Sequence, residues 1–272
     1  MTSIATNVPA VRVKYHGARN ETAQIQATER LSGGKRINQA SDDAAGMFVA
    51  QRIKVSIRGM ERAISNSQDG LGLVSTAESA INEIRNIVLR MRELSVQMAN
   101  GVYLDSPDRG FAQAEIDQLL QQVDMIAQNA NFNGLALLDG SFQNMAIHAG
   151  SSAEERISFS FGNRTTSGLG IAGLSIETQS NAKAAMNSLE TALAKLSNDL
   201  SLAGAYQNRL KHNISLLGST KRYNEIAFGR IMDADMAAEA TALSRAQVLA
   251  QANTAMLAQS NQALSTVLTL FN

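Results

Sequence analysis

The chain has 272 residues, with 24 basic and 24 acidic side chains, no cysteine and no tryptophan. The absence of cysteine excludes disulfides, thiolate metal sites and thiol nucleophiles. A net charge of zero gives no field that favours nucleic acid or an anionic membrane, and it lets like subunits approach one another. No apolar run reaches the roughly 18 residues of a transmembrane helix, so no membrane insertion is expected.

A first stripe of apolar residues recurs at steps of three and four, which places its members on one face of a long helix. Asn100–Gly101 follows the stripe and is a favourable C-terminal cap. The sequence therefore predicts a helix with an apolar face of Ile53, Ile57, Met60, Ile64, Leu71, Val74, Ile81, Ile84, Val88, Met91 and Met98.

A second helix is predicted after Ser106–Pro107–Asp108, because Ser is a favoured N-cap and Pro suits the first helical position. This helix is expected to end near Asn133–Gly134. The short loop between the two helices implies that they run antiparallel. The apolar face of the second helix contains Ala112, Ile116, Leu119, Val123, Ala127 and Ala130.

The region from about residue 140 to 176 is rich in glycine and predicts short extended segments. Arg156–Phe161 reads RISFSF, and this alternation with period two is typical of a strand. We expect Asn144–Ala149 to pair with it as a hairpin. Further extended chain is expected over Leu169–Ile176.

A third long helix is predicted from a heptad seam that is long enough for coiled-coil packing. The last segment, from about Asp233, is also helical by propensity. The members of the seam are Ala182, Met186, Leu189, Leu193, Leu196, Leu200, Ala203, Leu210, Ile214 and Leu217.

Both ends of the chain lack charge, which is unusual for helices in water. No charged residue follows Arg245, and none precedes Arg12. A solvated helix normally carries a charged face. The tail instead mixes Ala, Leu and Val with Gln, Asn, Ser and Thr, which suits burial against similar helices. We therefore expect the tail to be disordered in the monomer and to fold on assembly.

Four segments resemble, in the same order, the signatures of one family. They are LSGGKRINQASDDAAGM at Leu31–Met47, NEIRNIVLRMRELSVQMANG at Asn82–Gly101, ANFNGLALLDGSF at Ala130–Phe142 and SRAQVLAQANTAMLAQSNQ at Ser244–Gln262. On these motifs the sequence resembles bacterial flagellin, the subunit of the flagellar filament, over nearly the whole chain.

The resemblance implies a mainly α fold: a long antiparallel helical, coiled-coil bundle with a small β-hairpin region and paired N- and C-terminal segments. Residues 1–44 and 232–272 would form a discontinuous inner coiled-coil core domain. Residues 45–231 would form a rod-like helical shell domain, with its hairpin at about 140–176. No outer variable domain is expected, because the chain runs from Ile171 almost directly into the last long helices.

The implied function is that of a structural subunit that polymerises into the flagellar filament for swimming motility. A hook–filament junction protein is the alternative, and a non-flagellar surface adhesin is a second one. The implied partners are other subunits, the cap and hook-associated proteins and an export chaperone. The protein would be extracellular and exported without a cleaved signal peptide.

No enzyme activity, cofactor or metal is expected. The sequence contains no HExxH, P-loop or GxGxxG motif. The three histidines, at positions 16, 148 and 212, are far apart and lack the spacing of metal ligands. They are interpreted as structural residues.

Assembly contacts are expected from the apolar residues of the C-terminal tail and from an acidic pair near the N-terminus. Asp42 and Asp43, beside Lys35 and Arg36, are expected to form contacts between subunits or between helices. The alternative is an exposed cluster in which Ser41 caps the next helix. The residues expected at assembly contacts in the tail are Leu249, Met256, Leu257, Leu264, Leu268 and Phe271.

The resemblance implies a further function for one surface of the protein. In flagellins of many motile bacteria, the matching segment is recognised by the host Toll-like flagellin receptor. An exposed Leu94 between charged residues would suit such a contact. The residues that match this surface, which could also contact neighbouring protofilaments, are Arg90, Arg92, Glu93, Leu94 and Glu115.

Overall fold

The computed structural model describes residues 6–105, 107–152 and 154–269, and of residues 264–269 it describes the backbone only. The chain divides into two compact units. One consists of both chain ends, residues 1–57 and 222–272, and the other of residues 58–221. Within the described ranges, no helix is both long and apolar enough to cross a membrane.

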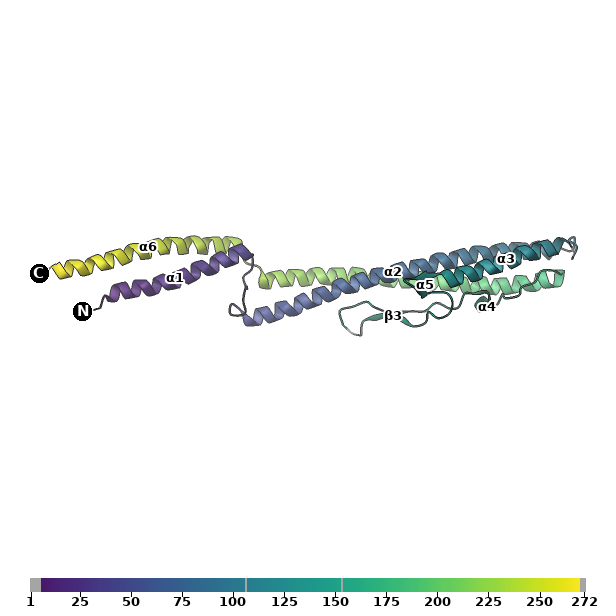
Figure 1. The fold of residues 1–272 in the computed structure, drawn as a ribbon, viewed down its shortest axis with the longest axis horizontal. Helices are drawn as coiled ribbons and strands as arrows, with labels where there is room; N and C mark the ends of the chain where they lie inside the picture. The colour runs from purple at the N-terminus through teal and green to yellow at the C-terminus, as the bar shows by residue number, and fades with distance from the viewer. Residues whose placement is uncertain (1–5, 106, 153, 270–272) are drawn as a thin grey trace. The chain divides into compact units, whose positions relative to one another are not determined.

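The two chain ends form the antiparallel helices α1 (Val8–Gly33) and α6 (Met236–Thr269), which lie side by side in Figure 1. Asn7 caps α1, because its Oδ1 accepts a hydrogen bond from the backbone N–H of Ala10 at 3.1 Å. The less exposed residues of both helices recur at steps of three and four, which marks their shared seam. The predicted pairing of the terminal segments is confirmed. The seam consists of Ala10, Val13, Gly17, Asn20, Gln24 and Ala27 in α1, and Leu243, Ala246, Ala250, Asn253, Leu257 and Ser260 in α6.

A connection of residues 34–43 leads from α1 into α2 (Ala44–Met98). It is tied to the chain that precedes α6, because the backbone N–H of Arg36 donates to the carbonyl of Met232 at 2.6 Å. A small buried cluster of apolar side chains also holds this connection in place within the unit. Its members are Ile37, Ala50 and Met232.

Two helices of more than fifty residues, α2 and α5 (Gln179–Met232), run through both units. α2 begins earlier than the predicted stripe, at Ala44, and ends at Met98 as predicted. In α5 every seventh residue of the predicted seam is buried, which confirms the heptad pattern. These buried residues are Ala182, Leu189, Leu196, Ala203, Leu210 and Leu217.

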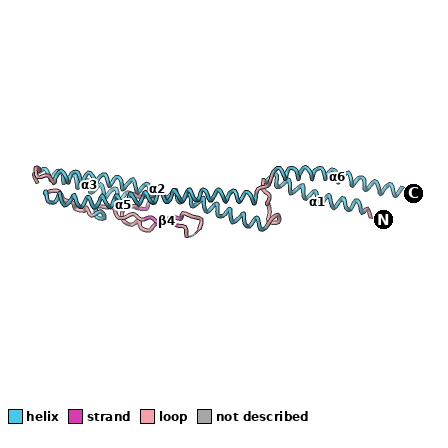
Figure 2. Tube along the Cα trace, turned by 180° about the vertical axis from the view of Figure 1, so that it is seen from behind, coloured by secondary structure: helices cyan, strands magenta, loops and turns pink. Residues whose placement is uncertain are grey.

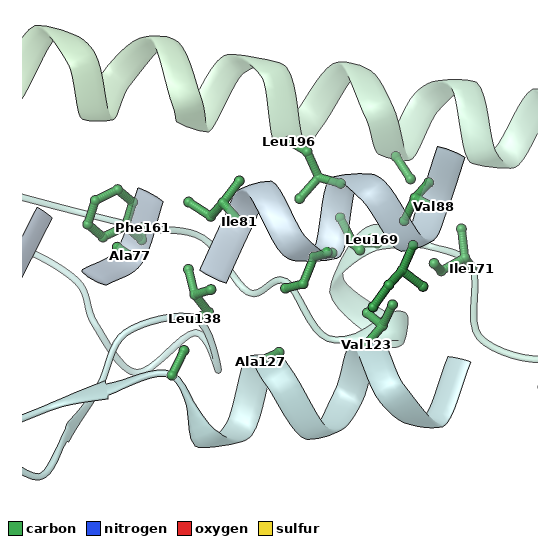
Figure 3. Close-up of a cluster of buried hydrophobic side chains, with 14 of the residues drawn as sticks. Ala77, Ile81, Val88, Val123, Ala127, Leu138, Phe161, Leu169, Ile171 and Leu196 are labelled. Atoms are coloured by element: carbon green, nitrogen blue, oxygen red, sulfur yellow. The ribbon is translucent and has the colours of Figure 1, made fainter. Parts of the chain in front are cut away.

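In the unit of residues 58–221, α2, α3 (Asp108–Asn129) and α5 lie alongside one another, and the chain of residues 131–176 packs against them (Figure 2). One continuous apolar core joins all four parts. This is the mainly α, antiparallel bundle that the sequence predicts. Figure 3 shows its centre, with Ala77, Ile81 and Val88 from α2, Val123 and Ala127 from α3, Leu196 from α5, and Leu138, Phe161, Leu169 and Ile171 from the connecting region.

The connecting region contains two antiparallel hairpins. The larger one confirms the predicted pairing, in a register that runs from Met145 opposite Phe159 to His148 opposite Arg156. Phe159 and Ile157 of this hairpin are buried, so its inner face joins the core. The strands are β1 (Asn131–Phe132), β2 (Leu135–Ala136), β3 (Met145–His148) and β4 (Arg156–Phe159).

The predicted end of the second helix is wrong. α3 ends at Asn129, and Asn133–Gly134 instead forms the turn between β1 and β2. Asn133 has φ 51° and Gly134 has φ 79°. These two consecutive positive φ angles are those of a two-residue hairpin turn, for which Asn-Gly is the favoured sequence.

Two further local predictions are wrong. α3 begins at Asp108, so Pro107 is its N-cap, without a side-chain hydrogen bond, rather than its first residue. Ser106, the predicted cap, lies outside the described residues. Leu169–Ile176 is not extended, because it starts with the end of the short helix α4 (Thr166–Leu169) and continues as an irregular loop.

The two units and the predicted domains are divided at different places. The units divide inside the long helices, at residues 57/58 and 221/222. The predicted inner and shell domains divide near the helix ends, at 44/45 and 231/232. The division into inner and shell domains stays a prediction.

Candidate assembly surfaces

The seam between α1 and α6 is held by small residues and amides rather than by large apolar side chains. Asn20 Nδ2 donates to the carbonyl of Ala246 at 2.7 Å, and Asn7 Nδ2 donates to the carbonyl of Ser260 at 3.1 Å. One ion pair, Arg30 with Glu239 at 3.2 Å, lies nearest the connection to α2. The fully buried apolar residues of the two helices, as far as the structure describes them, are alanines: Ala10, Ala27 and Ala246.

α6 has a second apolar face, which points away from the seam. Val248, Leu249, Ala252 and Met256 form it, and we call it the outer face of α6. At 100° per residue these four positions fall within one arc of roughly 100°, whose centre lies roughly 120° around the helix from Ala246 and Leu257. Val248 is 64%, Leu249 47% and Met256 54% exposed. A single subunit therefore leaves this face uncovered.

The outer face lies in the stretch that carries no charge. All residues after Arg245 are uncharged. α1 adds further exposed apolar side chains, Val8, Val11 and Tyr15. Contiguous exposed apolar surface without charge is characteristic of protein–protein contacts.

The structure places the predicted tail contacts in three different settings. Leu249 and Met256 lie on the exposed outer face, whereas Leu257 is half-buried on the seam. Leu264 and Leu268 belong to α6, but their side chains are outside the described part of the structure. Phe271 also lies outside the described residues.

Asp42 and Asp43 both bind the backbone of their own chain. Asp42 Oδ2 accepts hydrogen bonds from the backbone N–H groups of Gln39 at 3.1 Å and Asn38 at 3.0 Å, and these bonds lower the pKa of the Asp42 carboxyl. Asp43 Oδ1 accepts from the N–H of Gly46 at 2.8 Å, in the first turn of α2. The capping role expected of Ser41 is therefore filled by Asp43.

The neighbouring basic residues also have partners within the same unit. Arg36 Nη2 lies 3.7 Å from Asp43 Oδ2 and donates to the carbonyl of Ile231 at 2.9 Å. Lys35 forms a backbone bridge with Asp233. The contacts of Asp42 and Asp43 themselves stay within residues 36–46, as in the alternative of a capping cluster, and their contacts with other helices or subunits stay a prediction.

Arg90 connects the neighbouring helices α2 and α3 on the surface of the second unit. Its Nη2 lies 2.9 Å from Glu115 Oε1, and its Nη1 lies 3.5 Å from Glu93 Oε2. The two carboxylates raise the pKa of the Arg90 guanidinium, Glu115 more than Glu93. Arg92 is half-buried and lies roughly 200° around α2 from Arg90, on the other flank of the helix. Three of the four charged residues of the predicted surface thus lie together.

The fifth residue of that surface does not join them, and its predicted exposure is wrong. Leu94 is 5% exposed and belongs to the apolar core. α2 packs against both α3 and α5 here, so its buried side is wider than a single stripe and includes Ile87 and Leu94 as well. The exposed apolar residues of this segment are Leu89 and Val96.

Sequence reasoning missed the buried ionic groups that hold the connecting region in place. Arg164 Nη2 lies 2.8 Å from Asp199 Oδ1, its Nε also contacts this carboxylate, and both side chains are largely buried. Next to them, Asp124 accepts from the N–H and hydroxyl of Thr166 at 2.8 and 2.9 Å. No local motif marks these residues, because the partners are far apart in the sequence.

A second buried arginine shapes the turn between α2 and α3. Arg109 is 3% exposed. Its guanidinium donates to the carbonyls of Met98, Asn100 and Tyr103 and contacts Asp105. The turn that it organises and the first turn of α3 present three strongly exposed apolar residues, which the sequence patterns did not indicate. These are Val102, Leu104 and Phe111.

The histidines lie apart in the structure. His16, His148 and His212 are exposed, on α1, β3 and α5. Among the residues that the structure describes, no group of three or more His, Asp or Glu side chains is placed to hold a metal ion. The arrangements that stand out on the surface are apolar faces and ion pairs.

Comparison with known families and proteins gives matches at both ends of the chain. The family model of the bacterial flagellin N-terminal helical region matches residues 4–143, and that of the C-terminal helical region matches residues 186–271. The flagellar filament 33 kDa core protein of Treponema phagedenis is 37% identical over 258 residues, covering 89% of this chain and 90% of that protein. A flagellin of Halalkalibacterium halodurans is 36% identical, covering 97% of each chain.

Solved structures show the same fold. Bacillus cereus flagellin superposes with a TM-score of 0.51 at 29% identity, covering 56% of this chain and 88% of that one. A putative flagellar hook-associated protein of Vibrio parahaemolyticus has a TM-score of 0.60 at 13% identity, covering 71% and 100%. The second likeness concerns the fold alone.

Proposed function

The chain belongs to the bacterial flagellin family and is a structural subunit of the flagellar filament, and from this premise we propose that it polymerises through its paired terminal helices. The observation that carries the proposal is the outer face of α6. It is apolar, uncharged and uncovered in the single subunit. Other copies of the chain are the partners that cover it.

α6 has two apolar faces, and a single subunit covers only the first. The seam with α1 covers Ala246, Ala250 and Leu257, whereas the outer face stays in water. Burying Val248, Leu249 and Met256 against neighbours contributes roughly 25 cal/mol per Å² of apolar surface. An open filament requires contacts between two different patches, so that no ring closes. The outer face would be one of these patches.

The test is polymerisation of purified protein with the substitution Leu249→Asp. A carboxylate on the outer face would be desolvated by a neighbouring subunit, and we expect the critical concentration for polymerisation to rise at least tenfold. Gln247→Asp is the matched control, because it adds the same charge to an exposed position of α6 away from this face. Sedimentation and electron microscopy measure the polymer, and circular dichroism checks that both variants fold.

Two outcomes would overturn this proposal. One is a Leu249→Asp protein that polymerises at the wild-type concentration. The other is a Gln247→Asp protein that loses assembly to the same degree, since the apolar face would then not be the decisive contact.

The surface that includes Arg90, Glu93 and Glu115, with Arg92 on the other flank of α2, is proposed as a protein contact on the second unit, either with a neighbouring protofilament or with a host Toll-like flagellin receptor. Its ion pairs and the nearby exposed Leu89 support this role, whereas Leu94 is buried and would not take part. A receptor-reporter assay with monomeric protein distinguishes the two. A silent reporter at high concentration, with assembly weakened by Arg90→Ala, would leave only the protofilament contact.

The remaining parts of the proposal follow from the filament function. The protein acts by association and not as an enzyme, and it works outside the cell. Hook-associated and cap proteins and an export chaperone are further proposed partners.

Export would remove no leader, and the intact mass of protein from sheared filaments tests this point. A mass lower than the sequence predicts, by the length of an N-terminal peptide, would contradict it.

A further inference from the structure

Methionine is the residue at which mild oxidants can change this protein. The sequence has 11 methionines and neither cysteine nor tryptophan. Thioether groups are oxidised readily to sulfoxides when a reagent can reach them. Reactivity in this chain should therefore follow the exposure of the individual methionine side chains.

Eight of the methionines lie at one of two extremes of exposure. Met60, Met91, Met98 and Met232 are buried at 8% exposure or less. Four others are strongly exposed, between 40% and 54%. The exposed ones are Met125 on α3, Met145 on β3, and Met236 and Met256 on α6.

Met256 differs from the other three in its surroundings. It lies on the outer face of α6 with Leu249 and Ala252, inside the stretch that has no charged residue. Met236, in contrast, is the first residue of α6 and lies in the turn that Asp235 caps. The thioether of Met256 is thus accessible in the monomer and is part of the apolar surface that assembly covers.

We propose that Met256 is an oxidative modification site that controls polymerisation, with hydrogen peroxide or an alkyl hydroperoxide as the oxidant; this inference rests on the assembly role of the outer face. A lone pair of Met256 Sδ attacks one peroxide oxygen, the O–O bond breaks, and an S–O bond forms. The sulfur loses two electrons, and the peroxide is reduced to water or an alcohol. The product is methionine sulfoxide.

The sulfoxide blocks assembly through the cost of desolvating its oxygen. In the monomer this strong acceptor stays in water. In a polymer the apolar surface that covers the outer face would remove this water from the oxygen, and burial of an acceptor without its water is costly. Assembly has the opposite effect on the reaction, because a covered thioether is protected. Free subunits are therefore sensitive to oxidant, and assembled ones are not.

The test treats monomer and filament with the same limited dose of hydrogen peroxide. Peptide mass spectrometry should find Met256 oxidised at least tenfold faster in the monomer than in the filament, and faster than Met91 in either. The oxidised monomer should have at least a tenfold higher critical concentration. Reduction by methionine sulfoxide reductases should restore assembly. A Met256→Leu protein should assemble equally well before and after treatment, whereas Met125→Leu should stay sensitive.

The proposal is overturned if monomer with fully oxidised Met256 polymerises like untreated protein, or if Met256→Leu loses assembly on treatment as the wild type does. Failure of the underlying assembly role gives a different result. In that case untreated Leu249→Asp also polymerises normally. Loss of assembly by Leu249→Asp, together with normal assembly of the oxidised protein, refutes the oxidation site alone.

Discussion

Among single residues, a few largely or partly buried charged groups hold the second unit together. Arg164 and Asp199 join the connecting region to α5, and Lys195 Nζ donates to the carbonyls of Gly168 and Leu169 at 3.1 Å. Buried charges are costly without partners, so each member of such a group holds the others in place. Surface ion pairs such as that of Lys221 with Glu61 carry no comparable penalty.

Asp199→Ala should strongly destabilise the second unit. The substitution leaves the Arg164 guanidinium buried without its carboxylate, and such a loss costs about 3–5 kcal/mol. Denaturant titration measures the free energy of unfolding. Glu61→Ala is the control, because Glu61 is half-exposed and its loss should have a much smaller effect. An equal decrease in the free energy of unfolding of the two variants would show that the buried pair contributes no more to stability than the surface pair.

The connection before α2 should loosen in acid. Backbone N–H groups of Gln39 and Asn38 lower the pKa of Asp42 below its usual 3.8. A lowered folded-state pKa means that the contribution to stability is complete above the unfolded value and is lost as the pH falls through the folded one. Amide exchange of these two N–H groups should therefore speed up only below about pH 3.8, after correction for intrinsic rates. Asp42→Asn should remove this pH dependence, and an unchanged profile would contradict the assignment.

Single residues also show where sequence reasoning fails. The position of Leu94 on α2 could not be predicted, because its burial depends on α3 and α5 covering two sides of the same helix. Asp43 could have been preferred to Ser41 as the cap only if the first residue of α2 had been known. The charged residues Arg90 and Glu115 were grouped correctly, but through the family resemblance rather than through any local pattern.

At the scale of elements, periodicity was a reliable guide for the long helices. The residues spaced by seven from Ala182 to Leu217 form the buried seam of α5. A helix that packs on one side buries a single stripe of residues, and a stripe shows in the sequence as a regular spacing. Short elements were not predictable in the same way. α4 consists of Thr166–Leu169, and Asp124 of α3 binds its first residue, a contact that no local sequence shows.

Two glycines should respond in opposite directions to substitution by alanine. Gly204 lies inside α5, and a Cβ there would meet nothing within 4 Å, so Gly204→Ala should stabilise the helix by about 0.5–1 kcal/mol. At Gly168 in α4, a Cβ would lie 2.4 Å from the carbonyl oxygen of Asn163. Gly168→Ala should therefore destabilise the unit. Thermal unfolding measures both changes. A shift of the midpoint temperature in the same direction in both variants would contradict the prediction.

At the scale of the whole molecule, the two units differ in how they are stabilised. Residues 58–221 share one continuous apolar core, whereas α1 and α6 bury chiefly alanines along their seam. Large apolar side chains of α6 stay outside, on a face without charge. The absence of charge was visible in the sequence and indicated assembly. The separation of that surface into a seam and an outer face required the structure.

Hydrogen exchange can show whether other copies of the chain complete the terminal helices. We expect fast amide exchange for residues 246–263 in the monomer and at least a hundredfold slower exchange in the filament, because neighbouring subunits suppress local opening. Residues 81–98 of α2 should exchange slowly in both states, because they belong to the apolar core of one subunit. Equal exchange of residues 246–263 in monomer and filament would contradict the account.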